Sequence, residues 1–231
     1  MFLRIVIAFI LALLPVYSAE LTQEEKILRS EVIYKSGKNY VPLILYKGDI
    51  LRWNKAYFPI KIYLGNGYGI PNYYYEALKF AVTVWRDETE NFFRFEYVEN
   101  EKDANIVYKI LDKSSPDDTL AFTEAVIWGK RLDKQIINVY KKDNFNKYFD
   151  PRTITNVMIH EFGHALGIEG HSKDPTSIMY EFYSSKNSKT TPYLNGEDIN
   201  TIKLLYRIVP DITNGNKNKE KNWITKRVLF F

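Results

Sequence analysis

The chain has 231 residues, of which 45% are hydrophobic and 26% are charged, so its length and composition are those of one folded domain with a proper core. The formal net charge of +4 is too small to indicate a nucleic-acid partner, and no aromatic and basic cluster resembles a nucleic-acid-binding motif. The chain contains no cysteine, which excludes disulfide bonds but does not fix the compartment.

The first 19 residues have the features of a secretory signal peptide. Arg4 gives a positive start, residues 5–16 form a short apolar run, and the small residues Ser18 and Ala19 follow. The apolar run is too short to span a bilayer comfortably. We therefore expect an exported protein, secreted or periplasmic, with no integral membrane span once the signal is removed; an uncleaved N-terminal anchor is the alternative.

Residues 20–50 form an N-terminal extension. Residues 22–30 predict a short helix, with Thr22 as its cap and Glu25 completing a capping box. Residues 32–34 and 41–46 predict two short strands. The extension either packs on the following domain or acts as a short inhibitory peptide.

The domain that follows, residues 51–209, alternates between strand and helix signals. Residues 60–64 alternate with period two, which is typical of a strand. From residue 74 to residue 85, apolar residues recur at i, i+3, i+4 and i+7, which is typical of an amphipathic helix. Apolar or β-branched runs predict further strands at residues 93–97, 104–111, 120–128 and 135–140.

A second helix begins at Asp150, which can cap it, and at Pro151, which suits the first helical position because its missing N–H would be unpaired there. The sequence HEFGHALGIEGH lies in and after this helix, and its first two histidines are His160 and His164. Their i, i+4 spacing puts both imidazoles on one helix face, where they can bind one ion. Glu161 lies beside them, placed to reach a water on that ion without being a ligand.

Gly167 lies where this helix should end, because glycine adopts the left-handed conformation that ends helices. Gly170 then permits a tight turn that returns His171, the third and last histidine of the chain. Three imidazoles and one open position are typical of a catalytic zinc site, whereas structural sites have four protein ligands. If His171 failed to reach the metal, Glu169 or Asp174 would be the substitutes.

This stretch resembles the signature of the metzincin zinc endopeptidases, H-E-x-x-H-x-x-G-x-x-H followed by a Met-turn. HEFGHALG and the later SIMY are most similar to the matrixins, although the third histidine comes one residue later than usual, at His171. The resemblance covers about residues 51–209. It implies an α+β fold with a mixed, twisted five-stranded sheet, an antiparallel edge strand, an active-site helix, a Met-turn and a C-terminal helix.

The resemblance also implies the catalytic roles. One Zn²⁺ would be held by His160, His164 and His171, with Glu161 as general base and Met179 packed beneath the ligands as the Met-turn methionine. No histidine remains for a second, structural zinc. Calcium could bind carboxylates and backbone carbonyls, but no loop has the right density of ligands.

The same resemblance implies how a peptide or protein substrate would bind. The strand at residues 120–128 would be the sheet edge that pairs with the substrate backbone. In matrixins the chain after the methionine forms one wall of the S1′ pocket. Tyr183 stands where the family has a tyrosine and is the candidate substrate-binding residue, whereas Glu181 stands where the family has a proline.

Residues 195–209 predict a closing helix capped by Asn195, with Pro210 ending it. Residues 210–231 form a tail that either docks back on the domain or attaches the protein to a partner or membrane surface. The whole sequence therefore predicts an exported zinc-dependent endopeptidase. The alternative is an inactive zinc-containing module of the same fold that binds a peptide or partner without cleaving it.

Overall fold

The computed structural model describes residues 21–46, 48–65, 69–115, 119–128, 131–181, 192–208 and 221–224. The expected signal peptide and Tyr183 lie outside the described residues. None of the described helices is long and apolar enough to cross a membrane.

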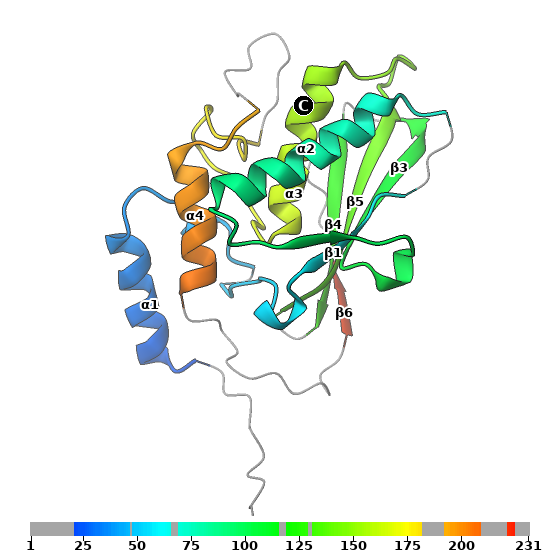
Figure 1. Ribbon diagram of the computed structural model, residues 1–231. Coiled ribbons are helices and arrows are strands. Elements are labelled where there is room, and N and C mark those ends of the chain that lie inside the picture. The colour runs from blue at the N-terminus through cyan, green and yellow to red at the C-terminus, as the bar shows by residue number, and fades with distance from the viewer. Residues whose placement is uncertain are drawn as a thin grey trace, which may run out of the picture.

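A six-stranded mixed sheet is the framework of the fold (Figure 1), in the order β2-β1-β3-β5-β4-β6. The pairs β2–β1, β1–β3 and β3–β5 are parallel, whereas β4 is antiparallel to β5 and to β6. The strands are β1 (Ile60–Tyr63), β2 (Phe95–Tyr97), β3 (Ile106–Ser114), β4 (Ala121–Trp128), β5 (Arg131–Lys142) and β6 (Lys221–Ile224).

The five strands predicted within residues 51–209 are confirmed, as is the antiparallel direction of β4. The sixth strand, β6, comes from the C-terminal tail and pairs with the outer edge of β4 from Ala125 to Trp128. From Ala125 to Trp128, the outermost strand of the sheet is therefore β6 and not β4. A strand of only four residues, KNWI, carries too weak a local signal to be predicted, and its pairing with the β4 edge decides its conformation.

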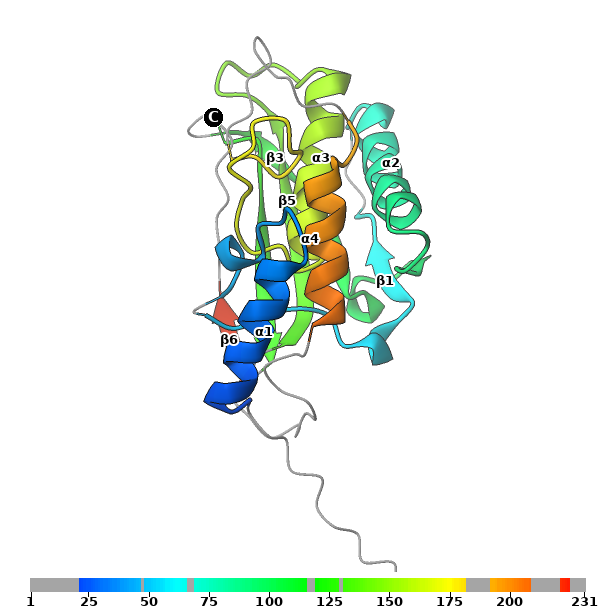
Figure 2. The same cartoon turned by 90° about the vertical axis from the view of Figure 1, so that its left-hand side faces the viewer.

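Helices α2 (Asn72–Glu88) and α3 (Pro151–Ala165) lie side by side over one face of the sheet (Figures 1 and 2). The predicted apolar stripe of α2 is buried, and Trp85 is fully enclosed, with its indole N–H donating to the Ile159 carbonyl at 2.8 Å. On the sheet, Ile137 and Val139 of β5 are fully buried. The core thus lies between the sheet and these two helices, which fixes α3 in place.

Helix α1 (Gln23–Lys35) begins with the predicted capping box: Thr22 Oγ1 accepts from the Glu25 N–H at 3.2 Å, and Glu25 Oε2 accepts from the Thr22 N–H at 2.8 Å. The strand predicted at residues 32–34 is wrong, because α1 continues through it. Ile33 and Arg29 are both buried, and their spacing of four residues is that of one helix face. Burial of that face outweighs the few tenths of a kcal/mol by which β-branched residues disfavour a helix.

The strand predicted at residues 41–46 is also wrong. Residues Val41–Leu43 form a 3₁₀ turn, η1, and Tyr46 makes only an isolated bridge with Asp49. Pro42 lacks the N–H that a ladder needs, so the segment turns instead. Val41 and Ile44 are at most 2% exposed, which places the extension in the same core as the domain.

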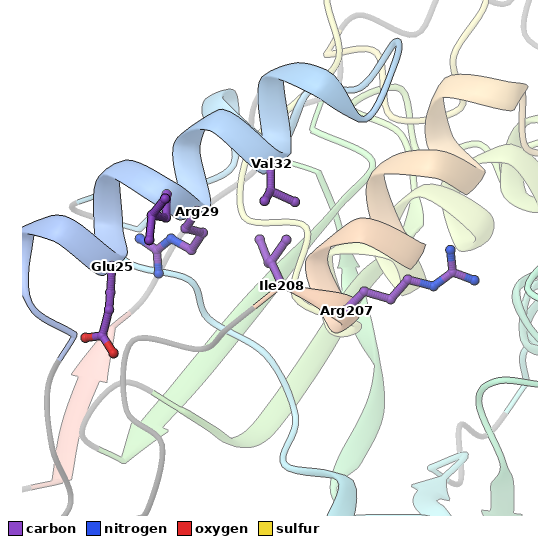
Figure 3. A pocket seen from close by; sticks show the side chains of 6 residues that line it. Glu25, Arg29, Val32, Arg207 and Ile208 are labelled. Atoms are coloured by element: carbon purple, nitrogen blue, oxygen red, sulfur yellow. The ribbon is translucent and has the colours of Figure 1, made fainter.

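Helix α4 (Gly196–Arg207) closes the described domain and also begins with a capping box, formed by Asn195 and Asp198. Helix α1 lies beside it (Figures 1 and 2). Figure 3 shows the pocket between α1 and the end of α4, lined by Glu25, Leu28, Arg29, Val32, Arg207 and Ile208. None of the three histidines lines this pocket.

Candidate active site

Helix α3 carries the first two histidines and Glu161. It begins as predicted, with Asp150 accepting from the backbone N–H groups of Arg152 and Thr153, each at 3.0 Å, and with Pro151 in the first turn. It ends at Ala165, and Gly167 follows two residues later with a φ of 107°, which residues with a side chain rarely adopt. A Cβ there would also lie 2.7 Å from the Leu51 carbonyl oxygen.

The imidazoles of His160 and His164 face each other across one helical turn. His160 Nδ1 lies 2.7 Å from the Ile178 carbonyl oxygen, and His164 Nδ1 lies 2.5 Å from the Ile168 carbonyl oxygen. Because a carbonyl only accepts, each Nδ1 carries the proton and each Nε2 presents a lone pair. The two Nε2 atoms are 2.9 Å apart. Burial and the neighbouring His171 hold the pKa of His160 well below its ordinary value, which favours the neutral ligand form.

The structure brings His171 to the same place despite its shifted position in the sequence. Its ring stacks on His160 with centroids 5.2 Å apart, and its centroid is 5.0 Å from that of His164. The ligand atoms of the three histidines all lie within 4.8 Å of one another. Asp174 instead accepts from the Thr176 backbone N–H and hydroxyl and pairs with Lys38 at 3.6 Å.

The turn before His171 is shaped by contact with the N-terminal extension. A Cβ on Gly170 would lie 2.3 Å from the Leu43 carbonyl oxygen of η1, so no side chain fits there. The sequence suggested that Gly170 is needed for a tight turn, but its φ is not positive, and the close approach of the η1 backbone is the physical reason for glycine. The extension thus supports the third histidine.

Met179 lies directly beneath the histidine helix. It is fully buried, and a Cβ on Gly163 would lie 2.5 Å from its sulfur and 2.7 Å from Trp85 Cζ2. The loop that carries it closes on itself, since the Ser172 N–H donates to the Met179 carbonyl at 2.9 Å. The methionine therefore fills the space between the histidine loop and α3.

Glu161 is fully buried and is held through one oxygen. The Thr123 hydroxyl of β4 donates to Glu161 Oε2 at 2.6 Å, while Oε1 has no hydrogen-bond partner among the described residues. Burial raises the pKa of the Glu161 carboxyl to about 8, and the hydrogen bond from Thr123 opposes that rise. Sequence reasoning missed Thr123, which is separated from Glu161 by 38 positions and carries no local signal of the contact.

Asp198, in α4, is hydrogen-bonded both to the loop that follows His171 and to Tyr40 of the N-terminal extension. Its Oδ1 accepts from the Ser177 hydroxyl at 2.5 Å and from the Tyr40 hydroxyl at 2.8 Å, and its Oδ2 accepts from the backbone N–H groups of Asn195 and Ile178. The Ile178 carbonyl in turn holds His160, so the carboxylate fixes the backbone that orients a histidine. No role in the site was predicted for Asp198 from the sequence.

The Asp198→Asn variant is therefore expected to be less stable. In the native chain both carboxylate oxygens of Asp198 accept hydrogen bonds, whereas the NH₂ group of an asparagine would face some of the same donors and could accept none. Each buried donor left unsatisfied costs about 1–3 kcal/mol, so the melting temperature should fall by about 5 °C or more. Thermal unfolding followed by circular dichroism measures it. Asp87→Asn, at an exposed carboxylate paired with Arg86, is the matched control and should change the melting temperature little. Equal shifts in both variants would contradict the role of Asp198.

The histidine group fits a zinc ion. Two unprotonated Nε2 atoms facing each other at 2.9 Å repel unless a cation lies with them, and the third imidazole lies alongside. A set of three imidazoles without cysteine matches a catalytic zinc centre with a position left for water. Among the described residues, this is the one group of histidine, aspartate and glutamate side chains that could hold a metal ion.

Comparison with known proteins agrees with this geometry. The family model for matrixins matches residues 70–207, more than half of the chain. The chain belongs to the matrixin family. The expected metzincin fold is thereby confirmed, and membership implies a zinc metalloprotease in general.

Several curated proteins are similar to this matrixin. A probable matrix metalloproteinase 095L of Invertebrate iridescent virus 3 is 33% identical over 144 residues, which are 54% of this chain and 36% of the relative. The 72 kDa type IV collagenase of Gallus gallus is 43% identical over 60 residues, 26% of this chain and 8% of the relative. Matrix metalloproteinase-27 of Homo sapiens is 44% identical over 54 residues, which are 23% of this chain and 10% of the relative. The matches span about a third or less of these relatives.

Proposed function

We propose that this matrixin is a zinc-dependent endopeptidase that hydrolyses peptide bonds with Glu161 as general base. The observation that carries the proposal is the pairing of three converging imidazoles with a buried carboxylate anchored by Thr123. The alternative, a zinc-containing module that binds without cleaving, is not favoured, because the residue needed for proton transfer is present and held. Export stays a prediction from residues 1–19.

His160, His164 and His171 would hold the zinc ion, which supplies a Lewis acid that activates water and polarises the scissile carbonyl. The Glu161 carboxylate takes a proton from the attacking water at Oε1, the oxygen without a partner among the described residues, and delivers it to the leaving amine nitrogen. Thr123 keeps Oε2 in place during both transfers. No serine or cysteine nucleophile is needed.

The substrate would be an extended peptide whose backbone pairs with the half of β4 near Thr123. Strand addition supplies main-chain hydrogen bonds with modest demands on sequence. The half of β4 that contains Thr123 does not include the Ala125–Trp128 segment, which pairs with β6. The Thr123 contact with Glu161 puts the catalytic carboxylate next to it.

The test is metal content and casein hydrolysis by the chain from Glu20 onward, before and after removal of metal with 1,10-phenanthroline. We expect one zinc per chain, loss of hydrolysis on chelation and recovery when zinc is added back. The melting temperature should fall with the metal, because a ligand that binds only the folded state stabilises it. A zinc-loaded chain that cleaves neither casein nor a mixed peptide library would contradict the proposal.

A further inference from the structure

The chain between α1 and η1 is hydrogen-bonded to α4, which lies beside α1 (Figures 1 and 2). Asn200 Nδ2 donates to the carbonyl oxygens of Ser36 and Lys38, at 3.0 and 2.8 Å. The next side chain of α4, Thr201, accepts from the Tyr40 N–H through its hydroxyl oxygen at 3.0 Å. Two consecutive residues of α4 therefore fix the backbone of the N-terminal extension.

Tyr40 carries this attachment into the interior of the domain. Its side chain is 2% exposed, and its hydroxyl donates to Asp198 Oδ1 at 2.8 Å. Burial and the Asp198 carboxylate raise the pKa of Tyr40 well above its ordinary value, so the hydroxyl keeps its proton and stays a donor. The next residue, Val41, is fully buried in the core.

A short series of hydrogen bonds leads from Tyr40 to a proposed zinc ligand. The Tyr40 hydroxyl shares Asp198 Oδ1 with the Ser177 hydroxyl. The other carboxylate oxygen, Oδ2, accepts from the Ile178 N–H at 3.3 Å, and the Ile178 carbonyl accepts from His160 Nδ1 at 2.7 Å. One carboxylate and one residue of the Met-turn loop thus connect the Tyr40 hydroxyl to the imidazole of His160.

The same part of the extension also contacts the turn before the third histidine. The Leu43 carbonyl lies so close to Gly170 that a Cβ does not fit between them. Two histidines of the group therefore depend on the extension, His160 through the Tyr40 hydroxyl and His171 through the Leu43 backbone.

We propose, on the basis of the proposed endopeptidase function, that Tyr40 is a positioning residue for His160 and that the N-terminal extension is a lasting part of the active enzyme. Removal of the extension would leave the buried Asp198 without one of its donors. It would also take the Leu43 backbone away from Gly170. Loss of the extension should therefore inactivate the enzyme, whereas loss of an inhibitory peptide would activate it.

Tyr40→Phe tests the proposal, because it removes the hydroxyl and keeps the ring that fills the core. Partners outside the ligand set contribute about 10–100-fold to metal affinity. Tyr40 acts through Asp198 and Ile178, so we expect the lower end of this range, a loss of about tenfold in zinc affinity. Competition of the chain from Glu20 onward with a chromogenic chelator measures it.

Tyr74→Phe is the matched control. Tyr74 is 1% exposed, and its hydroxyl donates to the Lys141 carbonyl at 2.8 Å and accepts from the Phe149 N–H at 3.2 Å, before the start of α3. Both variants lose one buried hydroxyl, so both metal-free chains should melt about 2–4 °C lower. Only Tyr40→Phe should bind zinc more weakly.

A nuclear magnetic resonance signal reports the orientation of His160 without any need for activity. The chain has only three histidines, so ¹⁵N labelling of histidine in the zinc-loaded protein resolves the Nδ1–H group of His160. In Tyr40→Phe we expect this signal to shift and its proton to exchange faster with solvent. In Tyr74→Phe it should stay unchanged.

A second variant, Thr201→Val, loosens Tyr40 at its backbone and leaves the groups around His160 in place. It should weaken zinc binding in the same direction. With saturating zinc, kcat/KM on a fluorogenic peptide should fall in both Tyr40→Phe and Thr201→Val. A rise in kcat/KM would instead identify the extension as inhibitory.

Wild-type zinc affinity in Tyr40→Phe with an unmoved His160 signal, beside a lower melting temperature, would make the hydroxyl merely structural and overturn the proposal. Equal weakening of zinc binding in Tyr74→Phe also overturns it, since any loss of stability would then loosen the metal. If the variants behave as expected but the zinc-loaded wild type never cleaves peptide, Tyr40 still positions His160, and only the proposed function is contradicted.

Discussion

Glu161→Gln is expected to keep one zinc ion per chain and to lose almost all hydrolysis. Glutamine has the size of glutamate and can still pair with the Thr123 hydroxyl, so the buried site remains filled. It cannot take a proton from water near neutral pH. Positioned general bases contribute about 10²–10⁴-fold, so kcat/KM should fall by about 10³-fold, equivalent to about 4 kcal/mol of transition-state stabilisation.

The measurement is kcat/KM on a fluorogenic peptide, with zinc content and melting temperature recorded on the same preparation. Glu31→Gln, the same chemical change on the exposed face of α1, is the matched control and should leave all three unchanged. Normal turnover by Glu161→Gln would exclude Glu161 as the general base. A variant without zinc would instead mean that the carboxylate helps to hold the metal site together.

The parts of the site that sequence alone predicts are those set by neighbours in the chain. Asp150 and Pro151 begin α3, and the i, i+4 spacing places two imidazoles on one face, whatever the rest of the fold does. The same holds for the capping box of α1. These features rest on backbone groups that lie within one turn of the side chain that satisfies them.

Predictions fail where distant contacts decide the local structure. Residues 32–34 look like a strand, yet they are helical because Ile33 buries on the core side of α1. The contact between Thr123 and Glu161 spans 38 positions, and that between Tyr40 and Asp198 spans 158. Neither partner carries a local signal of the other. Strand β6 likewise exists only because the β4 edge is there to pair with it.

His171→Ala is expected to lower the affinity for zinc by more than about 100-fold, because loss of a partner outside the ligand set already costs about 10–100-fold. The third histidine comes one residue later than in the usual metzincin signature. Its ring nevertheless stacks on His160. The extra residue is absorbed at Gly170, where only glycine fits against the Leu43 carbonyl. The shift is therefore a change of the loop path that leaves the imidazole in the group.

Competition of the apo chain with a chromogenic chelator measures this affinity, and circular dichroism checks that the variant folds. Asp174→Ala is the matched control, because its carboxylate follows His171 closely but accepts hydrogen bonds from Thr176 and pairs with Lys38. It should leave zinc affinity unchanged. Unchanged affinity in His171→Ala, with a loss in Asp174→Ala, would mean that the extra residue has exchanged the third ligand. A loss confined to His171→Ala would identify His171 as the third zinc ligand.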